Sequence, residues 1–153
     1  MGVLYKSITR GKGNVFGFLG EEIVRKVLGG EDHNTRDYDL LVNNKKIDVK
    51  TKKTSVTPKS NYECSVADVT RKQDCDYFAF VRVLNDQSVG WFLGLKERDE
   101  YYNEAVYLTK GEHDPSNNYF VKANCYNLPI SSLDQTVDAV SYTHLRAHET
   151  GRN

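Results

Sequence analysis

Asp39, Asp48 and Lys50 are the residues of this sequence whose types and spacing could best support catalysis. Two carboxylates held side by side repel each other, and a divalent cation between them turns that repulsion into binding. Lys50 lies two residues after Asp48, so both side chains point to the same face of an extended strand. The three residues therefore predict a metal site with a positive charge beside it, on a hairpin whose other face can be buried.

The two aspartates can meet only if a tight turn joins their strands. Residues 43–44 are both asparagine, which tolerates the left-handed backbone that a two-residue hairpin turn requires. If Val42 faces Lys45 across this turn, the register places Asp39 opposite Asp48. Directly opposed residues have Cβ atoms roughly 5 Å apart and share one face of the sheet. Asp37 is the alternative acid, although it would precede the strand.

A helix upstream supplies a third acid. Asn14 is suited to cap a helix that runs to about Leu28 and is closed by the glycines at 29 and 30. Glu21 lies at the edge of the apolar stripe and can project towards a sheet, whereas Glu22 lies nearer the basic side of the helix. An ordinary surface glutamate remains the other interpretation of Glu21. The expected buried stripe is Phe16, Leu19, Ile23 and Val27.

These motifs resemble a known family. Asp39 before Leu-Leu-Val, followed by Asp48-Val49-Lys50, is similar to the D…(D/E)-x-K signature of the PD-(D/E)XK nuclease superfamily. That superfamily includes restriction enzymes, Holliday-junction resolvases and phage recombination nucleases. The resemblance covers roughly residues 14–95. It implies an α/β fold with a restriction-endonuclease-like αβββαβ core and a mixed sheet.

The resemblance also implies a set of catalytic roles. Asp39, Asp48 and the backbone carbonyl of Val49 would hold Mg²⁺ or Mn²⁺, with Glu21 contacting the metal directly or through water. Lys50 would orient the attacking water and offset charge on the transition state. The implied activity is metal-dependent hydrolysis of DNA, by an endonuclease in phage or bacterial DNA processing. Many such nucleases act as homodimers.

The chain after the first hairpin predicts further elements of the same core. We expect a strand over residues 62–66, a short helix over 67–73, and a second hairpin formed by 77–83 and 88–95. The apolar run that begins at Tyr77 is typical of a central strand buried on both faces. Gln73 resembles a polar helix residue that some superfamily members use near the active site, and a surface or capping role is the alternative.

Lysines are concentrated around the proposed metal site. The window holds one acid, Asp48, and the lysines Lys45, Lys46, Lys50, Lys52, Lys53 and Lys59. Such a window can hold a phosphate backbone or can be a solvated strand edge. We expect nucleic-acid contacts from Lys45, Lys46, Lys52, Lys53 and Gln73. The formal net charge of the whole chain is +0, so any basic surface must be local.

Composition indicates one soluble domain. Three cysteines without C-x-x-C spacing favour neither a disulfide framework nor a zinc knuckle, and they suggest a reducing cytoplasm. No apolar run approaches the length of a membrane span, and the N-terminus lacks a signal-peptide pattern. Residues 140–150 resemble a translated sequencing adapter. We therefore expect a single nuclease-like domain over residues 1–139 and a non-native tail over 140–153.

Two other functions stay open at this point. The same fold could serve as a non-catalytic nucleic-acid-binding or phage accessory module, whose acids would be ordinary hairpin residues. The tyrosines between residues 96 and 139 could instead mark a structural or assembly protein with an exposed aromatic patch. Geometry separates these alternatives, because catalysis requires Asp39, Asp48 and Lys50 to converge and Glu21 to face them.

Overall fold

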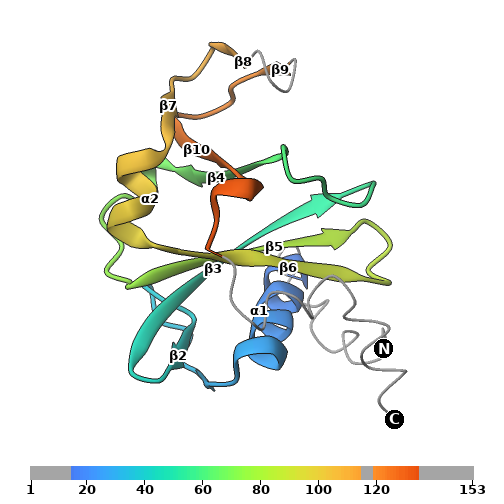
Figure 1. Cartoon of the computed structure of the whole chain (residues 1–153), viewed down its shortest axis with the longest axis vertical. Coiled ribbons are helices and arrows are strands. Elements are labelled where there is room, and N and C mark those ends of the chain that lie inside the picture. Colours follow the sequence, from blue (N-terminus) through green and yellow to red (C-terminus); the bar gives the residue numbers. More distant parts are fainter. Residues whose placement is uncertain (1–14, 115–118, 135–153) are drawn as a thin grey trace.

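The computed structural model of the chain describes residues 15–114 and 119–134 and has three layers. A five-stranded mixed sheet lies between α1 on one face and a three-stranded sheet with α2 on the other (Figure 1). The helices are α1 (Val15–Leu28) and α2 (Arg98–Glu104), and the short 3₁₀ turns are η2 (Asp68–Thr70) and η3 (Ile130–Ser132). The protein is thus mixed α/β, as expected from the sequence.

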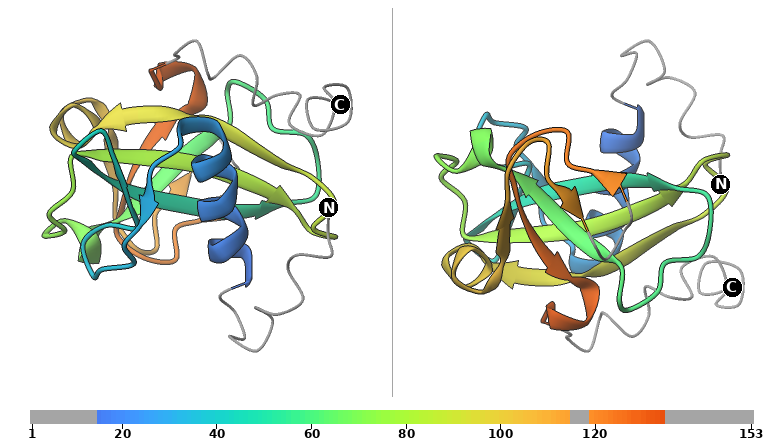
Figure 2. Two further views of the ribbon diagram at one scale, coloured as in Figure 1. Left: turned by 90° about the horizontal axis from the view of Figure 1, so that it is seen from below. Right: turned by 90° about the horizontal axis from the view of Figure 1, so that it is seen from above.

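The strands of the central sheet follow the order β1 (Glu31–Asp32), β2 (Leu40–Val42), β3 (Lys45–Thr54), β5 (Tyr77–Leu84) and β6 (Gly90–Glu97). The second sheet has the order β4 (Glu63–Ala67), β10 (Cys125–Pro129) and β7 (Val106–Leu108). A separate pair is formed by β8 (His113–Asp114) and β9 (Tyr119–Phe120). The two views of Figure 2 show α1 crossing one face of the central sheet and the second sheet covering the other.

The β2–β3 hairpin has the register that the sequence predicts. Its antiparallel pairs run from Val42–Lys45 to Leu40–Ile47. Both turn residues have positive φ, 48° at Asn43 and 67° at Asn44, as a two-residue hairpin turn demands. The ladder ends there, and Asp39 lies just before the first residue of β2. This ending matters because it leaves the backbone of β3 beyond Ile47 without a strand partner on that edge.

The second expected hairpin is also present, and its first strand is central. β5 pairs in parallel with β3 along its whole length and antiparallel with β6. Its residues alternate between two hydrophobic cores, with Ala79, Val81 and Val83 towards α1 and Phe78 and Phe80 towards the second sheet. The continuous apolar run is therefore explained by burial on both faces.

α1 packs closely on β3. Leu19 and Ile23 are buried as expected, and Val24, which the expected stripe omitted, is fully buried at 0% exposure. A Cβ placed on Gly20 would lie 1.8 Å from the Thr51 Oγ1 atom, so only glycine allows this approach. The tight contact fixes the height of the helix above the sheet and, with it, the position of Glu21.

The expected helix over residues 67–73 is wrong in extent. Only Asp68–Thr70 forms a 3₁₀ turn, and Val69 is 90% exposed, so this segment has no apolar side to pack on the sheet. The strand expected over residues 62–66 is present as β4, but its pairing in a second sheet and the helix α2 were not predicted. The adapter-like residues 140–150 lie outside the described residues. No helix in the described part of the chain is long and apolar enough to cross a membrane.

Candidate active site

Acidic side chains converge where β2 ends and β3 continues. The Asp39 N–H donates to the Ile47 carbonyl at 2.9 Å, and the Asp39 carbonyl accepts from the N–H groups of His33 and Asn34. Asp39 Oδ2 accepts from the Val49 N–H at 2.8 Å. The backbone of Asp39 is therefore fixed, and its carboxylate takes the place of the strand partner that Val49 lacks on this edge.

The same geometry directs a carbonyl group into the site. The N–H and C=O groups of one strand residue point to the same side of the strand, as in the paired bonds of an antiparallel ladder. Because the Val49 N–H points to Asp39, the Val49 carbonyl also points to the edge beyond β2. The Val49 carbonyl oxygen therefore points to the same edge as the Asp39 carboxylate.

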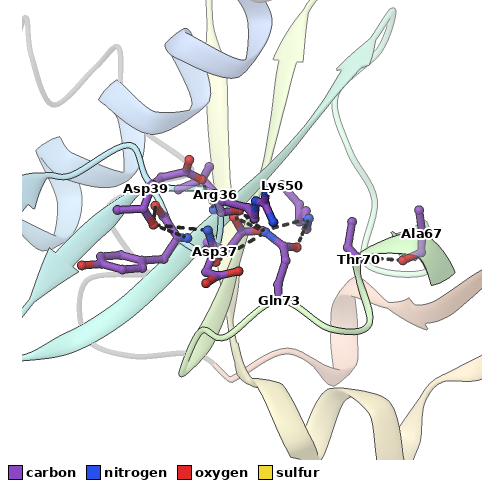
Figure 3. A network of polar contacts seen from close by, with 11 residues as sticks. Arg36, Asp37, Asp39, Lys50, Ala67, Thr70 and Gln73 are labelled. Carbon is purple, nitrogen blue, oxygen red and sulfur yellow. Dashed lines mark hydrogen bonds and ion pairs between the residues drawn. The ribbon is translucent and has the colours of Figure 1, made fainter.

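Asp48, Lys50 and Gln73 form the second half of the site. Asp48 is 5% exposed, and its Oδ2 lies 2.8 Å from Lys50 Nζ. The Gln73 side chain bridges the pair: its Nε2 donates to Asp48 Oδ1 at 3.2 Å, and its Oε1 accepts from Lys50 Nζ at 3.0 Å. Figure 3 shows Gln73 reaching up from the loop after η2 to Lys50. The same amide also contacts the carbonyls of Arg36 and Asp37, so the loop is tied to the segment before β2.

Glu21 reaches the group from α1, on the side of the sheet opposite Gln73. Burial, the charge of Asp39 and a hydrogen bond with the Asp39 carboxyl raise the pKa of Glu21 to about 8. Burial and the charge of Asp48 raise the pKa of Asp39 to about 6, against the lowering effect of the Val49 N–H. With these pKa values Glu21 keeps a proton near neutral pH and Asp39 is mostly ionised. The acids are close enough to compete for it, which is typical of functional sites.

The alternatives that the sequence left open are now separated by position. Glu22 pairs with Arg25 on the helix surface at 2.6 Å, while Glu21 contacts Asp39. Asp37 contributes its backbone carbonyl to the Gln73 contact, while the carboxylate that joins the acidic group belongs to Asp39. Glu21 and Asp39 are thus the acids that the fold brings to Asp48.

One buried oxygen of the acidic group is a candidate ligand for a cation. Asp48 Oδ2 is buried and accepts no hydrogen bond from the described residues, because its contact with Lys50 is an ion pair without hydrogen-bond geometry. This oxygen is balanced by the Lys50 charge alone, so it keeps lone pairs that a cation could accept as ligands. No group of three or more His, Cys, Asp or Glu side chains among the described residues has the spacing of a complete metal site. The oxygens that could still hold a cation are the carboxylates of Asp39 and Asp48 and the Val49 carbonyl, with Glu21 at the periphery.

The lysines expected to hold nucleic acid do not form one surface. Lys45 lies exposed at the end of the hairpin, and Lys46 pairs with Asp74 at 3.3 Å. Lys53 points to the α1 side, where its Nζ lies 5.2 Å from the centroid of the Phe16 ring. Lys52 is on the opposite face of β3 with Lys50. Side chains alternate between the two faces of a strand, so lysines that are neighbours in the sequence point to opposite faces of β3.

One basic residue near the site was missed. Arg82 lies on β5 directly beside Lys52 of β3 and is 8% exposed. Its signal in the sequence is that it is the one charged residue within the apolar run of residues 77–84.

Comparison of the chain with known protein families finds no match, and comparison with curated proteins finds none either.

Proposed function

We propose that the protein is a divalent-metal-dependent nuclease that hydrolyses phosphodiester bonds of DNA. The observation that carries the proposal is the convergence of the buried Asp48 carboxylate with Asp39, Lys50 and Gln73 at the end of the β2–β3 ladder. The element order supports it as well: apart from β4, which belongs to the second sheet, the chain runs α1, β1, β2, β3, η2 and β5, and this resembles an αβββαβ core with a 3₁₀ turn in place of the second helix.

Asp39, Asp48 and the Val49 carbonyl would hold Mg²⁺ or Mn²⁺, since oxygen ligands suit these ions and Mg²⁺ needs only one or two carboxylates. When bound, the ion would polarise the scissile phosphate and lower the pKa of a water molecule. Glu21 would give up its proton as the site fills, because carboxylate ligands must be deprotonated.

Lys50 would act on the phosphate and on the attacking water. Its side chain is 23% exposed, and its ammonium group is held between Asp48 and Gln73, so it presents a fixed positive charge to the site. A charge held in place before the reaction stabilises negative charge that develops in the transition state. Gln73 is a positioning residue in this scheme, because it fixes both Asp48 and Lys50 and contacts no reacting atom.

The test is cleavage of supercoiled, linear and branched DNA by the full chain with Mg²⁺ or Mn²⁺. We expect Asp48→Asn and Lys50→Met each to lower the cleavage rate by at least about 100-fold. Asp37→Asn is the matched control for Asp48→Asn, because it removes an equal charge from the neighbouring loop outside the acidic group. Its rate should stay within a few-fold of wild type.

Two outcomes would contradict the proposal. Equal activity in wild type and Asp48→Asn would show that any cutting comes from elsewhere. DNA binding without cutting by the folded wild-type protein would instead support a non-catalytic nucleic-acid-binding module on this fold.

A further inference from the structure

A second polar site adjoins the acidic one, on the face of β3 that carries Lys50. A pocket of about 170 Å³ lies between the central sheet and β4. Its floor is apolar, formed in part by Phe80 and Leu93, and its polar lining includes Lys50, Lys52, Glu63 and Arg82. Lys50 belongs to both sites, so the pocket continues directly from the acidic group.

Two cations lie next to each other in this pocket. Lys52 on β3 and Arg82 on β5 are direct partners in the parallel register, so their side chains share one face. Like charges in directly opposite positions destabilise a sheet. Partial removal from water, and after it the positive charge of Arg82, lower the pKa of Lys52, although its side chain stays exposed at the opening. The closeness of these two positive charges therefore costs stability, and a bound anion would offset that cost.

Burial of Arg82 adds to this cost. The guanidinium donates to the Glu63 backbone carbonyl at 2.8 Å, and its Cζ lies 5.3 Å from the centroid of the Tyr62 ring. Both contacts orient the group, but neither a carbonyl nor a ring supplies a full negative charge. Glu63 lines the pocket with one carboxylate, against the two charges of Lys52 and Arg82, while Lys50 at the end of the pocket is paired with Asp48.

Spacing relates this pocket to the acidic site. Lys50 and Lys52 are two residues apart on one face of β3, which is about 6.6 Å along the strand. Neighbouring phosphates along one strand of nucleic acid are separated by a similar length. A strand whose reacting phosphate meets Lys50 would thus bring an adjacent phosphate to Lys52 and Arg82.

We propose that the Lys52–Arg82 pocket binds a non-scissile phosphate of the nucleic-acid strand, next to the phosphate that is cut. The inference rests on the nuclease function proposed above and adds the site that would hold the substrate strand in register. Lys52 is the exposed contact at the opening, and Arg82 is the buried one.

The test measures DNA binding by the full chain in EDTA, by fluorescence anisotropy over a range of salt concentrations. Loss of one phosphate contact reduces the slope of log K against log salt by about 0.9 for duplex DNA and about 0.7 for a single strand. We expect this reduction in Lys52→Met and recovery in Lys52→Arg. Lys53→Met is the matched control, because the neighbouring lysine points to the α1 side and should leave the slope unchanged.

A neutral methylphosphonate, moved along the strand one position at a time, locates the contact. At one position it should weaken binding by wild type and not by Lys52→Met, as expected when both changes remove the same interaction. An unchanged slope in Lys52→Met, or equal slopes in Lys52→Met and Lys53→Met, overturns the phosphate subsite. If wild type still cuts DNA in that case, the nuclease proposal stands. If DNA binding depends on Lys52 but the protein does not cut DNA, the phosphate subsite stands and the nuclease proposal is wrong.

Discussion

At the scale of single residues, the acidic group is defined by which of its carboxyls holds a proton. Glu21 and Asp39 have pKa values raised to about 8 and about 6, mainly because both carboxyls are partly removed from water. Asp48 lies beside them and is held by Lys50 and Gln73. The negative charge of the three carboxyl groups is thus offset by one proton and by the ammonium group of Lys50. A bound cation would replace the proton.

Glu21→Gln should remove a pH-dependent loss of stability. From its ordinary pKa of 4.5 up to about 8, the folded protein keeps a proton on Glu21 that the unfolded chain has released. The native state binds more protons in this window, so stability falls as pH rises through it and levels off above pH 8. We expect the melting temperature of wild type to fall by a few degrees between pH 6.5 and 8.5, which lies above the pKa of Asp39, and that of Glu21→Gln to fall less.

Glu22→Gln is the control for this measurement. It makes the same change one residue along the helix, in a surface pair with Arg25. Its melting temperature should follow the wild-type pH dependence. Parallel curves for wild type and Glu21→Gln would show that Glu21 does not hold the proton.

At the scale of elements, the contact between α1 and β3 sets the position of Glu21. The contact depends on Gly20, which has no side chain to hold the helix away from Thr51. Gly17, on the same helix, has no atom within 4 Å of the position that a Cβ would take. The two glycines therefore make a matched pair, one required by packing and one only lowering helix propensity.

Gly20→Ala should destabilise the protein, and Gly17→Ala should stabilise it. Overpacking at Gly20 should cost about 1–3 kcal/mol. Alanine at Gly17 should contribute roughly 0.5–1 kcal/mol, because glycine is unfavourable within a helix. Urea unfolding measures both, and the double variant Gly20→Ala with Thr51→Ala should recover part of the loss. A neutral Gly20→Ala would mean that α1 can move away from β3 at little cost.

At the scale of the whole molecule, the two hydrophobic cores share β5. Leu19 is buried in the core under α1, whereas Trp91, the single tryptophan of the chain, packs against the core of the second sheet. Alternate residues of β5 enter one core or the other, so neither core can persist when this strand leaves the sheet. The described part of the chain should unfold as one unit.

Leu19→Ala tests this coupling. The change should cost about 2–5 kcal/mol. It should lower the urea midpoint equally when unfolding is followed by Trp91 fluorescence and by far-UV circular dichroism, although Trp91 lies on the other face of the sheet. Separate midpoints for the two probes would show that the cores unfold independently.

Local signals in the sequence predicted much of the central layer. The asparagine pair gave the hairpin and its register, and the buried run from Tyr77 gave the central strand, because turn chemistry and burial act over a few residues. The second sheet depends on pairing between distant segments, such as Leu128 with Cys64, which no short pattern encodes. The helix expected before Gln73 failed because propensity without an apolar face does not sustain a helix in a protein.

Part of the candidate site could likewise be predicted from local sequence, and part could not. Asp39, Asp48 and Lys50 follow from the hairpin register alone, whereas the choice of Glu21 over Glu22 needed the packing of α1 on the sheet. Arg82 was overlooked because an apolar strand draws attention to its hydrophobic residues. A single charge inside such a run was the available signal.

The crossover from β3 to β5 divides into two parts that differ in how freely their length can change. Residues 55–58 are mostly exposed and lie before the bonds that tie Lys59 and Ser60 to Tyr62 and η3, so evolution or design could insert residues there without moving a strand. The later part is held at both ends, by the bond from the Gln73 N–H to Thr70 and by the contacts of Asp76 with the Lys46 backbone. One added residue between Thr70 and Asp76 would carry Gln73 away from Asp48. Length variation among any relatives of this chain should therefore collect before β4 and be rare after η2.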